Sequence, residues 1–306
     1  MRQAAAGTVS GRPVLNGRFF MQELLRKYTD EHSRFLVIDD ALVHYRVEGQ
    51  GPPLLLLHGI FSSLHTFDGW VQHLRRDCQL IRVDLPGFGL SDTGADHRFT
   101  ILRYVQWLDV FMDRLGLDRC SIAGNSLGGW IAWEYALRFP ERVDKLVLID
   151  AAGYLDARRI PLPVRLARTP LFNRLARFAI RYNVVEVFIR QVYADPTRVT
   201  PELVQRYYDL LVRAGNPEAF LAFVNGQFRD DTAQLPRIQT ETLILWGEAD
   251  NWLPVNDAYR FLANIPRAQL IIYEGVGHVP MEEAPRLTAG DVRAFLLGKH
   301  VAETIK

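Results

Sequence analysis

Short apolar runs alternate with longer amphipathic stretches through most of this chain. An apolar run that ends in a turn is typical of a strand buried on both faces of a parallel sheet. Helical periodicity marks residues 101–115, 127–139, 255–265 and 284–297. This alternation predicts an α/β fold with helices on both faces of the sheet. The predicted buried strands are PLLLLHG, LIRVDLPGFG, CSIAG, KLVLID, TLILWG and QLIIYEG.

The N-terminal region has a different pattern. The segments FLVID and ALVHYRVE flank Asp39 and Asp40 and predict an antiparallel hairpin. Residues 1–34 are interpreted as a leader, with a short amphipathic helix expected at residues 19–28. The leader has no apolar run of signal-peptide length, and no segment reaches the roughly 18 apolar residues of a membrane span. We therefore expect a cytoplasmic protein.

Residues 154–231 interrupt the alternation. They are helical in pattern, are punctuated by prolines and contain no convincing buried strand. Because they fall between the strands KLVLID and TLILWG, we expect a helical cap above the carboxyl edge of the sheet, where ligands bind in open α/β folds. The expected organisation is a leader at 1–34, a core at 35–153 and 232–306, and a cap at 154–231.

Charge and cysteine content exclude several classes of protein. The formal net charge of +1 gives no reason to expect nucleic acid, and the two cysteines, Cys78 and Cys120, form no disulfide framework or zinc motif. We interpret both as buried small side chains. The cap is locally basic, which fits a solvated helix face or a weak association with anionic membrane surfaces. Between residues 158 and 190 the cations, set against the single acid Glu186, are Arg158, Arg159, Arg165, Arg168, Arg174, Arg177, Arg181 and Arg190.

One glycine-rich turn carries the first chemical signal. The segment GNSLGG follows a predicted strand and precedes a predicted helix, with Ser126 at its centre. Gly-x-Ser-x-Gly is the signature of a nucleophile elbow, in which small residues relieve crowding around an exposed serine. We therefore predict Ser126 as the nucleophile. The backbone N–H of Leu127, at the start of the helix, is an oxyanion-hole candidate.

A serine hydroxyl needs a general base, and the order of the later residues supplies one. In this fold the expected order is Ser, then Asp or Glu, then His. Asp250 follows the strand TLILWG, and His278 follows the strand QLIIYEG. We predict His278 as the base and Asp250 as the acid that orients it. Glu248 is the alternative acid.

The loop after PLLLLHG is expected to complete the site. Its residues Ile60 or Phe61 are candidates for the second backbone oxyanion donor, and a backbone donor leaves that choice open. We expect the substrate pocket to include Asn125, Phe61, Trp252 and Val279. Apolar cap positions such as Phe188 are expected to line the same pocket, with most cap arginines facing solvent.

The chain resembles the α/β-hydrolase family in its capped branch over residues 35–298. The resemblance rests on LLLHG, DLPGFGLSD, GNSLGG, GEADNWLP and GVGHVPMEEAP, which occur in family order and spacing. It implies a mostly parallel eight-stranded sheet, a helical cap, no cofactor and no metal. It also implies structural roles for His58-Gly59 and for the segment from Asp84 to Gly87, which shape loops near the site.

The elbow narrows the chemistry further. Haloalkane dehalogenases and epoxide hydrolases of this family carry Asp where this chain has Ser126, so those reactions are disfavoured. GNSLGG is similar to the elbow of the meta-cleavage-product C–C hydrolases. Those enzymes usually carry an HGxGPG loop and a Trp after the catalytic His, whereas this chain has HGIFSS and Val279.

We therefore predict a serine hydrolase, like a carboxylesterase or lipase, that cleaves small-molecule esters with an apolar acyl group. The first alternative is a C–C hydrolase acting on a vinylogous diketo acid, whose carboxylate a cap arginine would hold. The second is a hydrolase-like binding or sensing protein without catalysis. No nucleic acid and no obligate protein partner are expected.

Overall fold

The core of the protein is a single nine-stranded sheet. The computed structural model describes residues 17–94, 99–154, 180–226, 228–299 and 304–305. The strand order is β1-β2-β4-β3-β5-β6-β7-β8-β9. β1 pairs antiparallel with β2 and β2 antiparallel with β4, while the remaining pairings are parallel. The strands are β1 (Ser33–Ile38), β2 (Ala41–Glu48), β3 (Pro53–Leu57), β4 (Gln79–Val83), β5 (Cys120–Asn125), β6 (Val143–Ile149), β7 (Glu241–Gly247), β8 (Ala268–Tyr273) and β9 (Thr304–Ile305).

The predicted α/β fold is confirmed, including the N-terminal hairpin and the eight strands. The ninth strand is an addition of two residues that pairs with β8 at the sheet edge. Both faces of the sheet are covered: Leu55 and Leu57 of β3 belong to one apolar core, and Leu54 and Leu56 belong to the other. Continuous apolar runs are therefore buried on both faces, as expected for parallel strands.

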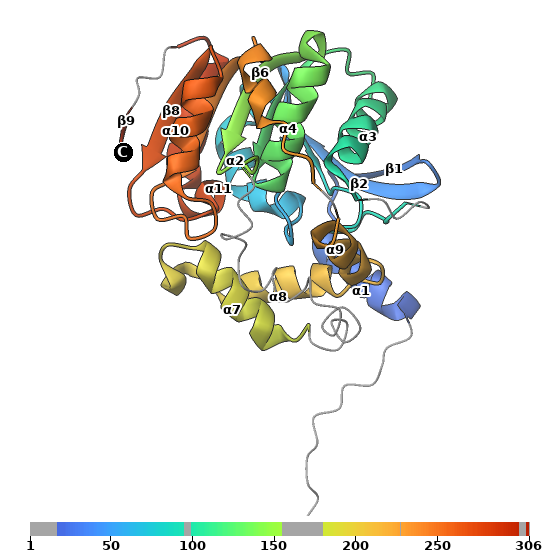
Figure 1. The fold of residues 1–306 in the computed structure, drawn as a ribbon. Coiled ribbons are helices and arrows are strands. Elements are labelled where there is room, and N and C mark those ends of the chain that lie inside the picture. The colour runs from blue at the N-terminus through green and yellow to red at the C-terminus, as the bar shows by residue number, and fades with distance from the viewer. Residues whose placement is uncertain (1–16, 95–98, 155–179, 227, 300–303, 306) are drawn as a thin grey trace, which may run out of the picture.

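Helices form the two outer layers (Figure 1). One core contains side chains of α3 (Ile101–Arg114), α4 (Leu127–Arg138) and α10 (Val255–Asn264), and the other contains those of α2 (Asp68–Leu74) and α12 (Pro285–Leu296). The helix predicted over 284–297 is preceded by a separate short helix, α11 (Pro280–Glu283). Pro285 starts α12 because proline fits the first turn of a helix but not its interior.

Three described helices lie between β6 and β7: α7 (Tyr182–Val192), α8 (Pro201–Leu211) and α9 (Asn216–Val224). We call the described residues 180–226 the insertion. Figure 1 shows these helices together on one side of the core. Residues 155–179 and 227 of the predicted cap lie outside the described residues, and so do Arg158, Arg159, Arg165, Arg168, Arg174 and Arg177. Of the other predicted arginines, Arg181 is exposed and Arg190 pairs with Glu186.

The insertion is bonded to α11 and to the loop before it. The backbone N–H of His278 donates to the carbonyl oxygen of Val192 at 2.8 Å. Arg198 donates to the carbonyl oxygen of Glu283, and Tyr193 donates to the carboxylate of Glu282. Some apolar side chains of α7 are covered and others are exposed to solvent. Phe188 is partly buried, whereas Val184 and Val187 are 53% and 59% exposed.

The first described helix, α1 (Gly17–Tyr28), packs on the insertion. Lys27 and the Tyr28 hydroxyl both donate to Asp209 of α8 at 2.7 Å. Leu24 and Tyr28 are buried in a small apolar cluster with Leu210. Among the described helices, none combines the length and the hydropathy that a membrane crossing needs.

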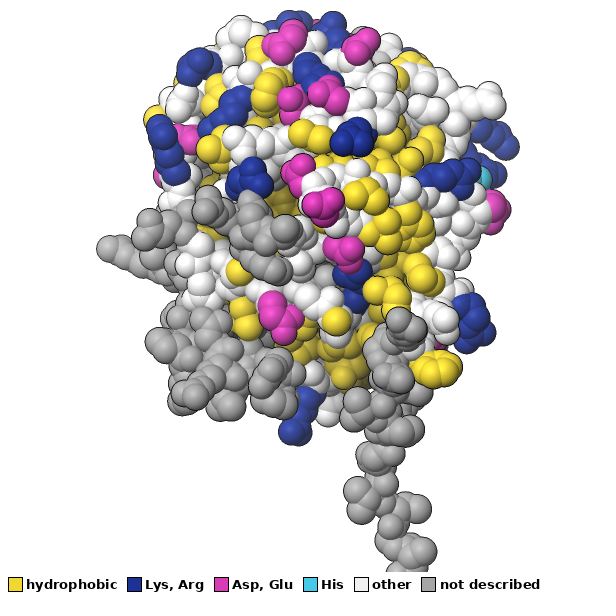
Figure 2. All heavy atoms as spheres, turned by 90° about the vertical axis from the view of Figure 1, so that its right-hand side faces the viewer, with side chains coloured by type: hydrophobic (Ala, Val, Ile, Leu, Met, Phe, Trp, Pro, Cys, Tyr) yellow, Lys and Arg dark blue, Asp and Glu magenta, His cyan; other side chains and the backbone are white. Residues whose placement is uncertain are grey.

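The sheet edge formed by β1 and β2 carries exposed apolar side chains. Phe35, Val37 and Leu42 are all exposed large hydrophobic residues of this hairpin. β1 and β2 lie at the right of Figure 1, and Figure 2, which views the molecule from that side, shows hydrophobic side chains gathered in a band across the face. Most of the other apolar strand residues are buried, so this hairpin is the least covered part of the sheet that the structure describes.

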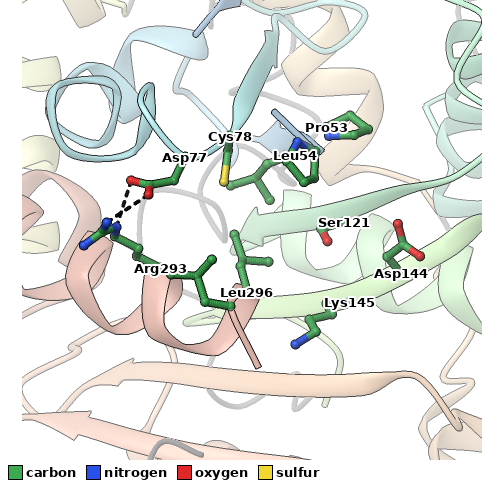
Figure 3. A pocket seen from close by; sticks show the side chains of 11 residues that line it. Pro53, Leu54, Asp77, Cys78, Ser121, Asp144, Lys145, Arg293 and Leu296 are labelled. Atoms are coloured by element: carbon green, nitrogen blue, oxygen red, sulfur yellow. Dashed lines mark hydrogen bonds and ion pairs between the residues drawn. The ribbon is translucent and has the colours of Figure 1, made fainter. Parts of the chain in front are cut away.

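Both cysteines are buried free thiols, as predicted. Cys78 lines a cavity of about 240 Å³ at the amino ends of the parallel strands (Figure 3). The same cavity contains the ion pair between Asp77 and Arg293, with Nε and Oδ2 2.8 Å apart. Burial raises the pKa of the Cys78 thiol, which makes it a poor nucleophile. The chemistry of the protein therefore has to be sought at the other edge of the sheet.

Candidate active site

Ser126 stands at a strained turn between β5 and α4. Its backbone has φ 53° and ψ −111°, in a region that side chains other than glycine rarely adopt. The strain is held by backbone hydrogen bonds. The Ser126 N–H donates to Ile149, and the Ser126 carbonyl oxygen accepts from Trp130 and Ala152, each at 3.0 Å. The predicted elbow residue therefore has the backbone geometry of a nucleophile elbow.

The glycines around Ser126 are required by close backbone approach. A Cβ atom on Gly124 would lie 2.2 Å from the carbonyl oxygen of Gly128. A Cβ atom on Gly128 would lie 2.2 Å from the carbonyl oxygen of Leu57 in β3. Both neighbours are backbone atoms, which cannot move aside as a side chain could. The close packing of β3, β5 and α4 therefore requires glycine at both positions.

His278 and Asp250 form a direct hydrogen bond. Nδ1 of His278 lies 2.7 Å from Oδ2 of Asp250, and the Asp250 side chain is fully buried. The other oxygen, Oδ1, accepts from the backbone N–H groups of Trp252 at 2.7 Å and Leu253 at 3.1 Å. With Nδ1–H donating to Asp250, the basic nitrogen of neutral His278 is Nε2. Glu248, the alternative acid, is exposed.

Several contacts fix the loop that carries His278. The side-chain amide of Asn125 donates to the carbonyl oxygen of His278 at 3.0 Å, and Glu283 accepts from the N–H of Gly277 at 2.8 Å. The Trp252 ring stacks on the His278 ring at 5.6 Å. Sequence reasoning did not single out Glu283, although it lies within the quoted motif GVGHVPMEEAP.

The loop after β3 has an unusual backbone at one of the two oxyanion candidates. Phe61 adopts φ 63°, and Ser62 closes a turn by donating to the carbonyl oxygen of Gly59 at 3.3 Å. His58 holds this loop, because its Nδ1–H donates to Gly59 at 2.7 Å while Nε2 accepts from the N–H of Leu85 at 3.0 Å. Burial lowers the pKa of His58 and keeps it neutral. The choice between Ile60 and Phe61 as donor stays a prediction.

Ser126 and His278 line the same small cavity, of about 20 Å³. Such a volume accommodates about one water molecule, so substrate entry requires surrounding groups to move. The predicted pocket residues Asn125, Phe61, Trp252 and Val279 all line it. None of the described lining residues is an aspartate, glutamate, lysine or arginine. The remaining lining residues are Gly59, Ile60, Ser62, Phe188, Ile189, Val192 and Tyr207.

A second buried carboxylate, Asp150, lies beside the pair. It directly follows β6, has no exposed surface and accepts from the N–H of Gly247 at 2.9 Å. Burial, followed by the negative charge of Asp250, raises the pKa of Asp150 well above its usual value. Sequence reasoning missed this residue. The one sequence feature that could have pointed to Asp150 is its place as an acidic residue at the end of the buried segment KLVLID.

Comparison with known proteins supports the same family. Residues 52–285 match the α/β-hydrolase fold family. The chain is 28% identical to a 2-hydroxy-6-oxo-6-phenylhexa-2,4-dienoate hydrolase of Comamonas testosteroni, across 84% of this chain and 93% of the relative. It is 32% identical to a 2-hydroxy-6-oxononadienedioate/2-hydroxy-6-oxononatrienedioate hydrolase of Paraburkholderia phymatum, across 77% and 84%.

A solved structure extends the comparison to the whole fold. The crystal structure of a membrane phospholipase A, described as a bacterial virulence factor, superposes with a TM-score of 0.76 at 28% identity and covers 92% of both chains. The family match covers most of the chain, and it agrees with the sheet order, the elbow and the hydrogen-bonded pair. The chain is therefore a hydrolase that belongs to the α/β-hydrolase family.

Proposed function

We propose that the protein hydrolyses carboxylic esters with an apolar acyl group through an acyl-enzyme on Ser126. The observation that carries this proposal is the strained Ser126 in one largely apolar cavity with His278, which is itself bonded to Asp250. A serine at such a turn beside a histidine–carboxylate pair is suited to acyl transfer.

The proposed reaction follows from these positions. Nε2 of His278 takes the Ser126 proton while Oγ attacks the acyl carbon, and the backbone N–H groups of Leu127 and of Ile60 or Phe61 stabilise the oxyanion. The alcohol leaves with the proton from His278. A water molecule, deprotonated by His278, then releases the acid and restores Ser126. Asp250 stabilises the imidazolium in both steps.

The walls of the cavity support an apolar acyl group. Phe61, Phe188 and Trp252 form a continuous aromatic contact, with ring centroids 4.4 Å and 4.5 Å apart. Burying an acyl chain against such walls is worth about 0.8 kcal/mol per methylene. The structural similarity to a protein described as a membrane phospholipase A supports a lipase-like reaction.

A second candidate function is hydrolysis of a C–C bond, and the named relatives favour it. The two curated relatives described above are named as hydrolases of a 2-hydroxy-6-oxo dienoate and of a 2-hydroxy-6-oxo dienedioate or trienedioate, so judged by their names this alternative has more support than ester cleavage. Such a substrate needs a cation for its carboxylate. The described arginines Arg190, Arg206 and Arg213 pair with Glu186, Glu282 and Asp92 instead. Arg198 pairs with Asp195 and Arg181 is exposed, and none of these five arginines lines the cavity.

Two measurements test these proposals. A fluorophosphonate probe is expected to label the wild-type protein and not Ser126→Ala. Failure to label folded wild type would instead support a non-catalytic binding protein. Catalytic efficiency is then compared for p-nitrophenyl acetate, butyrate and hexanoate and for 2-hydroxy-6-oxo-6-phenylhexa-2,4-dienoate. We expect efficiency to rise with acyl length, whereas efficient cleavage of the dienoate with weak ester turnover would select the C–C hydrolase.

A further inference from the structure

Two carboxyl groups share the buried end of the sheet next to His278. Asp150 follows β6 and Asp250 lies in the loop after β7, and these two strands are paired neighbours with Ile149 opposite Leu245. One carboxyl oxygen of Asp150, one of Asp250 and a ring nitrogen of His278 all lie within 4.8 Å of one another. The catalytic proposal above uses Asp250 and leaves Asp150 without a role.

The hydrogen-bond donors around the two groups are distributed unequally. Asp250 accepts from His278, Trp252 and Leu253. Asp150 accepts only from Gly247 on Oδ1, and its buried Oδ2 has no hydrogen-bond partner among the described residues. N–H donors stabilise the ionised form of a carboxyl group, so Asp250 is the better place for the negative charge.

No described lysine or arginine is among the leading electrostatic influences on Asp150, and Arg198 acts on the neighbouring Glu283. The titratable groups that act on it are Asp250, Glu283 of α11 and, across the sheet, Tyr273 of β8, together with nearby His278. Two ionised carboxylates that lie side by side in a buried site repel strongly, which favours retention of a proton on one of them.

We propose that Asp150 is a positioning residue: its carboxyl group stays protonated and donates a hydrogen bond from Oδ2 to Asp250. This arrangement gives Oδ2 of Asp150 a hydrogen-bond partner. It also adds one donor to those that hold Asp250 against His278. It leaves a single negative charge on the pair, which is the charge that His278 needs when it becomes an imidazolium. The inference rests on the proposed role of His278 as general base.

The substitution Asp150→Asn tests the proposal because an amide retains both an acceptor for Gly247 and a donor for Asp250, and does not titrate. We expect Asp150→Asn to be labelled by the fluorophosphonate probe at pH 7 within about threefold of the wild-type rate. Asp150→Ala should be labelled about 10- to 100-fold more slowly, the effect of one lost hydrogen bond to a charged group. Equal rates for wild type and Asp150→Ala, or loss of labelling in folded Asp150→Asn, would overturn it.

A second readout reports the proton itself. Above about pH 4 the unfolded chain releases the proton that folded Asp150 is proposed to keep. The folding equilibrium constant of wild type should therefore fall about tenfold, relative to that of Asp150→Asn, for each unit by which pH rises. Urea unfolding of both proteins from pH 5 to pH 8 measures this difference. Parallel pH dependences would show that Asp150 is ionised in the folded protein and would refute the proposal.

These outcomes are separable from failure of the proposed function. If folded wild type is not labelled at all, Ser126 is not an activated nucleophile and the catalytic proposal fails, while the unfolding comparison still decides the protonation of Asp150. If wild type is labelled and the Asp150 variants do not differ from it, only the inference about Asp150 fails. Should Asp150→Ala not fold, Asp150→Asn alone decides through its rate and its pH dependence.

Discussion

The side-chain amide of Asn125 joins the nucleophile turn to the histidine loop by donating to the carbonyl oxygen of His278 at 3.0 Å. The same amide nitrogen donates to Ile149 at 3.2 Å. One side chain on β5 thus connects the carboxyl end of β6 with the loop after β8. We expect this link to help fix the position of His278 relative to Ser126, since both residues lie on short turns outside the strands.

We expect Asn125→Ala to lower kcat of ester hydrolysis by about 10-fold or more and stability by about 1–3 kcal/mol, because the buried carbonyl of His278 loses its side-chain donor and that of Ile149 keeps only the N–H of Ser126. Urea unfolding and steady-state kinetics measure both effects. Asn264→Ala is the control, since Asn264 bonds within α10 and to Tyr154, away from the site. Full activity in Asn125→Ala would show that the loop is held by other contacts.

The acid assignment predicts a large difference between two neighbouring residues. Asp250→Asn is expected to reduce turnover by about four orders of magnitude while the fold is kept, because an amide favours the wrong tautomer of His278. Glu248→Gln should leave turnover within about twofold, since Glu248 is exposed. The reverse result in the same hydrolysis assay would move the acid to Glu248.

Two glycine substitutions with opposite expected signs test the packing of the elbow. Gly124→Ala places a Cβ atom 2.2 Å from the carbonyl oxygen of Gly128 and should cost about 3 kcal/mol or more. Gly290→Ala in α12 meets nothing within 4 Å and should stabilise the protein by about 0.5–1 kcal/mol. Thermal unfolding compares the two variants. A stable, active Gly124→Ala protein would contradict the described turn.

Glu282 is expected to hold the insertion on the core. Its carboxylate accepts from Thr66 of the core at 2.5 Å and, from the insertion, from Tyr193 and Tyr207 at 2.7 Å and Arg206 at 3.1 Å. Glu282→Ala should cost about 2–3 kcal/mol, because it leaves these buried donors without their acceptor. It should also speed limited proteolysis of the insertion.

Glu186→Ala, which breaks only the pair within α7, is the control and should cost less than about 0.5 kcal/mol. Equal effects of the two substitutions would rule out this role for Glu282.

A buried histidine predicts part of the acid sensitivity. Burial lowers the pKa of His65 from its usual 6.5 to about 3. As pH falls below 6.5, the unfolded chain binds a proton at His65 that the folded protein does not bind. The folding equilibrium constant therefore falls about tenfold for each unit by which pH decreases. His65→Gln should therefore lose less stability than wild type between pH 6.5 and pH 4.5, measured by urea unfolding. Exposed His73 provides the control, His73→Gln. Parallel curves for wild type and His65→Gln would disprove the assignment.

Sequence patterns predicted the strands and the three residues of the proposed triad because Ser126 directly follows one apolar strand, and Asp250 and His278 follow two others within a few residues. Asp150 also follows such a strand, yet its importance depends on the register of β6 and β7, which brings it beside Asp250. Glu282 could not be found in this way, since its partners are far apart in the sequence. They are Thr66 in the short turn before α2, Tyr193, and Tyr207 of α8. The two-residue β9 is too short to produce any periodic pattern.

The insertion leaves the sheet at β6 and returns at β7, and these strands are hydrogen-bonded neighbours. The two ends of the excursion are therefore fixed side by side by the sheet itself, and the entropy of closing such a loop grows only with the logarithm of its length. A change in the length of the segment between these strands therefore costs little closure entropy, and Ser126, Asp250 and His278 lie on other segments of the core. If the proposed function holds, the lining of the substrate cavity by the insertion can change while the proposed catalytic residues stay in place, and a relative's segment can be grafted between β6 and β7 to exploit this.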